Sequence, residues 1–151
     1  MPPRVFGHIS YYLPGDVFNH RIALSRAGVH RPTRAGISGS AAEGADSIVL
    51  ADQYEDDVFE EDYLMYAGHG GRDRETGHQV TDQELSPKNQ ALLKSQATGL
   101  PVRVVRKVAH EGNLVYRYEG LYQVVGATFE AGKSGFKVWK FRLVPFPVAP
   151  A

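Results

Sequence analysis

Frequent glycines and prolines divide the chain into short apolar segments, and this spacing constrains the fold more than any other feature. The chain has 16 glycines and nine prolines, and the segments between them are rich in Val, Ile, Tyr and Phe. Such residues between turn formers are typical of short β-strands. Strands are predicted at residues 17–24, 47–51, 63–67, 102–108, 114–118, 121–129 and 136–144.

The last of these strands has the clearest pattern. Phe136, Val138, Phe141 and Leu143 recur among basic residues at about the spacing of a half-buried strand. The alternation slips at Trp139, which indicates either a bulge or burial on both faces at that position.

One helix is well marked. Ser86 suits an N-cap, Pro87 suits the first helical position, and residues 89–97 are good helix formers before Gly99-Leu100-Pro101 ends the run. Many strands and one convincing helix predict an α+β, mainly β fold, in which a curved sheet or barrel carries helical cover.

The length of 151 residues corresponds to one domain. We expect this domain to span residues 1–151, with a core at about 5–144 and a flexible, proline-rich tail at 145–151. No apolar run reaches the roughly 20 residues of a membrane span, and no signal peptide is visible, so no membrane contact is expected. The absence of cysteine excludes disulfides, zinc–thiolate sites and cysteine nucleophiles.

The formal net charge is zero, with 17 basic and 17 acidic residues, which at first argues against nucleic acid as a partner. The average hides an asymmetry, because seven of the acids lie within residues 52–62 and the remainder carries a net charge of +7. The folded surface can therefore have a basic face and an acidic corner, although charge alone favours a mixed, solvated surface.

The segment Gly132-Lys133-Ser134 is similar to the end of a phosphate-binding loop, but its surroundings do not fit. The preceding glycine, Gly126, lies one residue too far away, and a strand follows where that loop needs a helix. We expect a hairpin turn with an exposed lysine, which can still touch a phosphate.

Metal and hydrolase patterns also fail on spacing. The six histidines form neither i, i+4 helical pairs nor a His-x-His arrangement, and the acidic run lacks the alternating ligands and glycine of a calcium loop. Asp56 and Asp57 are adjacent, so on a strand their side chains point to opposite faces. We therefore expect no metal and no other cofactor.

A slot for a flat ring is one interpretation of residues 50–73. Tyr54 and Tyr66 flank a carboxylate, and the glycine-rich segment 68–71 gives the neighbouring backbone freedom. Two aromatic rings and a carboxylate can sandwich a base and accept hydrogen bonds from its amino group. From spacing alone, core tyrosines beside an acidic loop are the better interpretation.

Eight short segments, read together, carry more information than any one of them. They lie at residues 5–9, 28–32, 35–37, 54–57, 66–73, 101–106, 118–122 and 132–136. Their order and composition closely resemble those of the SRA domain, also called YDG, over about residues 5–143. The Tyr-Asp-Gly element behind the second name appears here as Tyr118-Glu119-Gly120.

This resemblance implies a twisted, crescent-like β-barrel of the SRA/PUA-like kind, with a few covering helices. It also implies binding of double-stranded DNA, with a modified cytosine, typically 5-methylcytosine, flipped into a pocket. By matching motif, Tyr54 and Tyr66 stack on the flipped base and Asp57 accepts hydrogen bonds from its amine and ring edge. Backbone amides near Ala51 and Asp52 complete the edge contacts.

Base stacking contributes about 1–3 kcal/mol per base and extrusion costs a few kcal/mol, so contacts to phosphates must supply much of the affinity. The resemblance makes Arg31, Arg72, Lys133 and Ser134, with some of Arg103, Arg106 and Lys137, candidates for these contacts.

The resemblance further implies a loop at residues 30–36 that reaches into the duplex. Thr33 and Arg34 belong to this inserting segment, and Arg34 matches the position that fills the hole left by the flipped base. A guanidinium can both stack on bases and donate hydrogen bonds to them.

Several departures from the vertebrate members bear on specificity. In the pocket, Ala67 replaces a hydroxyl residue, His69 a small residue, and Asp52-Gln53 a glycine pair. These changes leave both 5-methylcytosine and 5-hydroxymethylcytosine open as the modified base. The second inserting loop, at residues 74–81, is short and lacks a basic Asn-Lys-Arg finger, so a strong preference for hemimethylated sites is not expected.

We expect a reader of modified cytosine in duplex DNA. We expect it to be non-enzymatic, because the chain shows no catalytic motif, and to be located inside the cell with DNA. Prokaryotic relatives often carry an HNH-type nuclease, so the alternative is the recognition part, or a partner, of a modification-dependent restriction endonuclease. A base-excising glycosylase that uses Asp57 to activate water is a weaker alternative. A barrel that binds an apolar ligand or peptide would not explain the ordered motifs.

Overall fold

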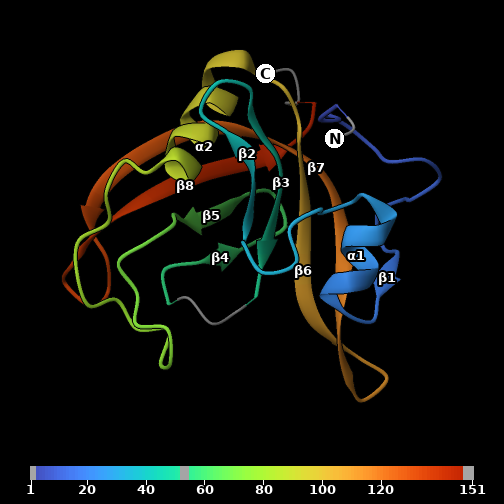
Figure 1. Ribbon diagram of the computed structural model, residues 1–151, viewed down its shortest axis with the longest axis horizontal. Helices are drawn as coiled ribbons and strands as arrows, with labels where there is room; N and C mark the ends of the chain where they lie inside the picture. The colour runs from blue at the N-terminus through green and yellow to red at the C-terminus, as the bar shows by residue number, and fades with distance from the viewer. Residues whose placement is uncertain (1–2, 52–54, 148–151) are drawn as a thin grey trace.

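One curved sheet flanked by helices makes up most of the structure, a computed structural model that describes residues 3–51 and 55–147 (Figure 1). In chain order, the elements of these residues are β1 (Val17–Phe18), α1 (Arg21–Ala27), β2 (Ile37–Ser40), β3 (Gly44–Leu50), β4 (Val58–Phe59), β5 (Leu64–Ala67), α2 (Pro87–Thr98), β6 (Val102–His110), β7 (Asn113–Ala131) and β8 (Lys137–Pro145).

The strands follow the order β2-β3-β6-β7-β8-β5-β4, and β1 pairs beside this path with β7. The pairing of β3 with β6 is parallel, and the other pairings are antiparallel. The predicted α+β, mainly β fold with covering helices is confirmed. Over the described residues the expected barrel takes the form of a curved sheet that is not closed, with β2 and β4 at its ends.

Strand β7 curves because of two bulges. It runs through 19 residues where the sequence predicts two strands, since its register slips at Glu119 and again at Val125 without ending the strand. An unpaired residue bends a strand and increases its twist. Gly120, next to the first bulge, has a φ of 101°, which a residue without Cβ adopts at no steric cost. Trp139 pairs in register with Phe129, so the bulge lies on β7 rather than at Trp139.

Helix α1 occupies a segment for which the prediction was wrong. Residues 17–24 were predicted as a strand, but the extended part ends at Phe18 and the helix begins at Arg21. The Nδ1 atom of His20 accepts the Ala23 N–H at 3.1 Å, and Gly28 ends the helix with a φ of 81°. These two caps set the helix boundaries locally.

Helix α2 confirms its prediction. The Ser86 hydroxyl accepts the Asn89 N–H, Pro87 is the first helical residue, and Gly99 closes the helix with a φ of 71°. The hydroxyl of Ser95 accepts the Ala45 N–H at 2.9 Å, so α2 is joined to the start of β3 by a hydrogen bond as well as by packing. The short strands β2 and β4 were not predicted.

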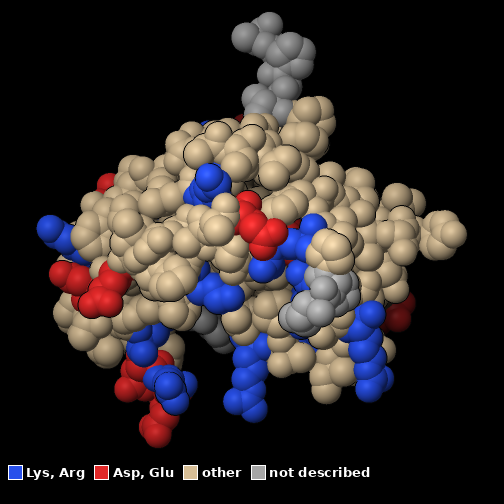
Figure 2. Space-filling model, turned by 45° about the horizontal axis from the view of Figure 1, so that its top comes forward, with Lys and Arg blue, Asp and Glu red and all other residues tan. Residues whose placement is uncertain are grey.

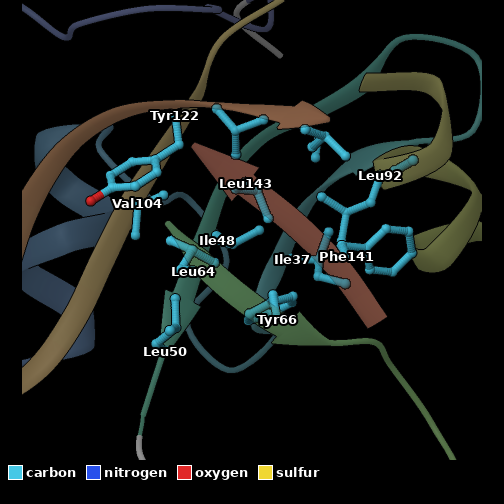
Figure 3. Close-up of a cluster of buried hydrophobic side chains, with 14 residues drawn as sticks. Ile37, Ile48, Leu50, Leu64, Tyr66, Leu92, Val104, Tyr122, Phe141 and Leu143 are labelled. Carbon is cyan, nitrogen blue, oxygen red and sulfur yellow. The ribbon is translucent and has the colours of Figure 1, made fainter. Parts of the chain in front are cut away.

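Two clusters of buried side chains hold the helices to the sheet. The first contains Leu92 of α2 with Phe141 of β8 and Val104 of β6 (Figure 3). The second contains Leu24 of α1 with Val105 of β6. Because Val104 and Val105 are neighbours and fall in different clusters, β6 is buried on both faces, as a central strand of a covered sheet must be.

The predicted tail begins within the sheet. Pro145 is the last residue of β8, and the Phe146 N–H donates to the Leu121 carbonyl at 2.9 Å. Residues 148–151 lie outside the described residues. Neither of the helices described is long and apolar enough to cross a membrane.

Candidate nucleic-acid interface

Three of the predicted base-pocket residues meet between β4 and β5. Asp57 immediately precedes β4, while Tyr66 and Ala67 are the last residues of β5. The Ala67 N–H donates to Asp57 Oδ1 at 2.7 Å, which fixes the orientation of the carboxylate beside the tyrosine. Ala51 follows β3 and is partly exposed.

Tyr66 is covered in this structure. Its side chain is 2% exposed and belongs to the cluster under α2 (Figure 3), and a methyl group at Gly36 would lie 2.7 Å from its hydroxyl. A base that stacks on this ring must displace part of what covers it. Tyr54 and Asp52, the other predicted pocket residues, lie outside the described residues.

The neighbouring carboxylate, that of Asp56, binds a different part of the fold. Asp56 is 7% exposed, and its Oδ1 accepts the Lys133 N–H at 3.0 Å across 77 residues of sequence. Gly132 is packed against it, because a methyl group there would lie 2.5 Å from Asp56 Oδ2. Asp56 thus anchors the β7–β8 hairpin while Asp57 anchors β5, so the adjacent carboxylates bind different parts of the fold, although neither residue lies on a strand.

The Gly-Lys-Ser segment forms the predicted hairpin turn. The Gly135 N–H donates to the Gly132 carbonyl at 3.0 Å, and the Gly132 N–H donates to the Phe136 carbonyl at 2.9 Å. Lys133 and Ser134 are exposed at the tip. Their positions are compatible with the predicted phosphate contacts.

The predicted inserting loop, residues 30–36, connects α1 to β2. Thr33 and Arg34 are exposed on it. Arg31 is only partly exposed, and its guanidinium lies 4.0 Å from the buried carboxylate of Asp46. The loop therefore presents Arg34 to solvent, whereas the charge of Arg31 is partly balanced from within the protein.

Side chains of α1 hold the backbone of this loop. The guanidinium of Arg21 donates to the carbonyl oxygens of Pro32 at 3.0 Å, Arg34 at 3.3 Å and Ala35 at 2.6 Å. The hydroxyl of Ser25 donates to the Arg31 carbonyl at 2.7 Å. Sequence reasoning missed both residues: Arg21 fell in the segment 17–24 that was predicted as a strand, and Ser25 lay just beyond it in a segment with no predicted element.

His30 anchors the same loop from beneath. It is fully buried, with Nε2 at 2.8 Å from the Ala35 carbonyl and Nδ1 at 2.7 Å from the Ser47 hydroxyl. A carbonyl only accepts, so Nε2 carries the proton and Nδ1 accepts from Ser47. Burial is the main reason that the pKa of His30 falls from 6.5 to about 4, with the positive charge of Arg21 also lowering it.

Buried amides fix the glycine-rich segment after β5. Gln83 donates to the Gly68 carbonyl at 2.7 Å and accepts the Trp139 N–H at 2.9 Å. Asn89, on α2, accepts the His69 N–H at 2.8 Å. These contacts join the segment to β8 and α2, and no sequence motif signalled them.

Arg72 lies on this segment and is partly exposed. Its guanidinium donates to the Gly68 carbonyl at 2.9 Å. An open cavity of about 390 Å³ lies beside it, lined by residues 69–77. Burial, followed by the positive charges of Arg72 and Lys88, lowers the pKa of His69.

Arg103 was one of the candidates for phosphate contacts, and its position in the structure contradicts that prediction. Its side chain is 1% exposed, donates to the carbonyls of Val29 at 2.8 Å and Gly7 at 2.8 Å, and pairs with Asp46 at 3.2 Å. It therefore holds the N-terminal segment to the sheet. Arg106 is also partly covered, with its guanidinium 4.3 Å from the centre of the Phe59 ring.

The Tyr-Glu-Gly element is structural in this chain. The Tyr118 hydroxyl lies 2.8 Å from Nδ1 of His8, and burial raises the pKa of Tyr118 to about 12. Glu119 pairs with Arg117 across the bulge of β7. Within the described residues, the contacts of this element thus join it to the N-terminal segment and to the neighbouring part of β7.

Charged side chains are unevenly distributed over the face in Figure 2. Basic side chains spread over most of it, and acidic ones gather at the left and lower left, with further acidic side chains near the middle and at the right edge. Asp46 and Asp56 are buried and so contribute little to the surface. Within the described residues, no three histidines or acids lie close enough together to hold a metal ion.

The curved sheet, the two helices packed against it and the acidic site beside β5 define an SRA-type fold. The chain belongs to the SAD/SRA domain family, whose model matches residues 5–148.

Relatives and solved structures agree with this assignment. The E3 ubiquitin-protein ligase UHRF1 of Bos taurus is 39% identical over 175 residues, covering 99% of this chain and 22% of that protein. The chain thus spans about a fifth of the length of this curated relative.

Two proteins of known structure extend the comparison. The modification-dependent TagI restriction endonuclease matches with a TM-score of 0.87 and 41% identity, over 96% of this chain and 53% of that one. The SRA domain of SUVH5, in complexes with fully methylated and hemimethylated CG DNA, matches with a TM-score of 0.81 and 36% identity, over 97% of both chains. Its complex with fully hydroxymethylated CG DNA matches with a TM-score of 0.79 and 35% identity, again over 97% of both chains.

Proposed function

We propose that this chain binds double-stranded DNA containing a modified cytosine and holds that base, turned out of the helix, between Tyr54 and Tyr66 with Asp57 at its edge. The observation that carries the proposal is the fixed carboxylate of Asp57, bonded to the Ala67 N–H directly beside Tyr66. The SUVH5 complexes with methylated DNA support it, because the likeness extends over nearly the whole of both chains.

The chemistry of cytosine fits this arrangement. Its exocyclic amine is a donor, and an ionised carboxylate is an acceptor with two oxygens. One carboxylate oxygen of Asp57 is oriented by the backbone of β5, so the group does not have to be ordered when the base arrives. Stacking on a tyrosine contributes about 1–3 kcal/mol, the same scale as the cost of extruding a base.

Phosphate contacts supply the remaining affinity in this proposal. Lys133 and Ser134 at the exposed hairpin tip and Arg34 on the inserting loop are accessible to a duplex. Arg72 and Arg31, both partly exposed, are further contacts. The hydrogen bond between Asp56 and the Lys133 N–H joins the hairpin to the segment that carries Asp57. This bond therefore sets the distance between the base site and the phosphate contact of Lys133.

We take 5-methylcytosine as the modified base, with 5-hydroxymethylcytosine as the second possibility. Ala67 offers a methyl group where a hydroxyl would otherwise stand, and an apolar neighbour suits a methyl substituent better than a hydroxymethyl group. Because SUVH5 has a structure in complex with hydroxymethylated CG DNA, the binding experiment below also includes 5-hydroxymethylcytosine.

A second candidate function is the recognition part, or a partner, of a modification-dependent restriction endonuclease. The likeness to TagI favours it, since this chain matches about half of that enzyme. In both cases the residues described here read the base and perform no catalysis, and the protein acts inside the cell, where the DNA is. Incubation with methylated plasmid and Mg²⁺ tests this, because cleavage by the chain alone would require a catalytic site.

The decisive experiment replaces one oxygen of the reading carboxylate. Asp57→Asn keeps an oxygen for the Ala67 N–H but puts an NH₂ group where the carboxylate offered a second acceptor. The matched control is Asp56→Asn, which loses the same charge one residue away. Competition binding at fixed salt compares duplexes with unmodified, hemimethylated, fully methylated and hydroxymethylated cytosine.

We expect Asp57→Asn to lose about tenfold or more in its preference for the modified duplex, the scale of a hydrogen bond to a charged group. The Asp56→Asn protein should keep its preference and bind all duplexes somewhat more weakly. Equal affinity of the unchanged protein for modified and plain duplexes would refute the proposed function.

A further inference from the structure

We infer that Arg21 is a positioning residue for base replacement: it fixes the backbone of the 30–36 loop so that Arg34 is already presented to the duplex before DNA binds. The inference rests on the proposed function, in which Arg34 enters the space left by the extruded base. Arg21 itself belongs to α1 and not to the loop that it contacts.

The loop is held by its carbonyl oxygens. Arg21 alone binds three of them, at 2.6, 3.0 and 3.3 Å. The hydroxyl of Ser25, one turn further along α1, binds the Arg31 carbonyl at 2.7 Å, and His30 binds the Ala35 carbonyl at 2.8 Å. Four of the five carbonyls from residue 31 to residue 35 therefore receive a side-chain donor.

An arginine suits this role better than a lysine does. A guanidinium presents five N–H groups in one rigid plane and can bridge several acceptors at once, whereas a lysine is a single point on a flexible stem. The Arg21 donors meet carbonyl oxygens of residues on both sides of Thr33, so they hold the two ends of the tip together. The exposed side chains of Thr33 and Arg34 are left to face solvent.

The advantage for binding is preorganisation. A loop that inserts into a duplex loses conformational freedom, and every residue ordered beforehand reduces that cost at the moment of binding. Helix α1 is itself fixed to the sheet through Leu24, which is fully buried. A series of contacts thus connects the sheet to the inserted side chain of Arg34: Leu24 holds α1 to the sheet, and Arg21 holds the loop backbone to α1.

The test compares Arg21→Gln with Arg26→Gln. Both lose one positive charge from α1, but Arg26 is exposed on the same helix and lies outside the loop contacts described. Affinities for modified and plain duplexes are measured at several salt concentrations, and fluorescence of 2-aminopurine next to the target cytosine reports unstacking. Arg21→Lys is a second variant that keeps the charge and loses the planar fork.

We expect Arg21→Gln and Arg21→Lys to lose about tenfold in affinity for the modified duplex, the scale of one charge-assisted hydrogen bond, and much less for the plain duplex. Arg26→Gln should match the unchanged protein in preference. In an Arg34→Ala background the Arg21 effect should disappear, because a positioning residue has nothing left to position.

Two results would overturn the inference. Equal preference in the Arg21 and Arg26 variants would show that the loop needs no clamp. An equal loss for plain and modified duplexes, with the salt slope reduced by about 0.9, would show that Arg21 contacts a phosphate itself.

A DNA-free measurement separates this inference from the proposed function. Trypsin can cut after Arg34, and the cut should be faster in Arg21→Gln than in Arg26→Gln if the clamp orders the loop. If the unchanged protein does not distinguish modified DNA, the proposed function fails, while the proteolysis result still decides whether Arg21 holds the loop.

Discussion

The fully buried residue His30 should make the protein less stable as the pH is lowered. The neutral ring is matched to its surroundings, because it donates to a carbonyl and accepts from a hydroxyl in a fully buried position. Protonation puts a charge into that position, near the positive charges of Arg21 and Arg103 and only partly offset by Asp46. Folding therefore disfavours the protonated form.

The magnitude follows from the two protonation equilibria. The pKa of His30 is about 4 in the folded protein, against the ordinary histidine value of 6.5, so the unfolded chain binds the proton first as the pH falls. The stabilisation is fully present above pH 6.5 and is lost as the pH falls from 6.5 toward 4. The loss amounts to about 2 kcal/mol at pH 5 and about 3 kcal/mol at pH 4.

The assay is urea unfolding at pH 7.5, 6.5, 5.5 and 4.5 for the unchanged protein, His30→Gln and His110→Gln. Glutamine can still donate to the Ala35 carbonyl but cannot take up a proton. His110 is exposed at the end of β6, so its variant controls for the loss of a histidine. The free energy of unfolding of His30→Gln should fall less with pH than that of the other two proteins. Identical pH dependence in all three would refute the reasoning.

Three further predictions concern other anchors. Lys133→Ala should weaken plain and modified duplexes equally and reduce the salt slope by about 0.9, whereas a change in preference would contradict a phosphate contact. Gly132→Ala should destabilise the protein by about 1–3 kcal/mol in urea unfolding, because its methyl group meets Asp56; an unchanged midpoint would show that the hairpin yields. Arg103→Met should cost about 3–5 kcal/mol by leaving Asp46 with weaker pairing, and a small loss would mean that Asp46 finds another partner.

Local signals predicted local structure well. Ser86, Pro87 and Gly99 set the limits of α2 because a cap, a fixed φ and a left-handed residue act within a few residues. The prediction failed at α1, where apolar residues at 17–24 suggested a strand and the caps at His20 and Gly28 were overlooked. A histidine is a less common cap than serine or aspartate, so its signal is weak.

The candidate site shows a different limit. Asp57 and Tyr66 were identified by the order of motifs along the chain, and the structure brings them together, with Asp57 just before β4 and Tyr66 on the neighbouring strand β5. The contact of Asp56 with Lys133 had no such pattern, because it joins a loop to a hairpin 77 residues away. Spacing predicts which residues share an element, and only the fold shows which elements share a hydrogen bond.

A neutral net charge says little about a DNA-binding surface once the interior is known. The buried carboxylate of Asp46 is matched to buried Arg103, and that of Asp56 to a backbone amide, so neither opposes a phosphate at the surface. The same holds for cations, since Arg21 is directed at carbonyl oxygens rather than outward. To infer from charge whether a protein binds DNA, one must therefore count only the charged groups that face solvent. Here these include Lys133 and Arg34.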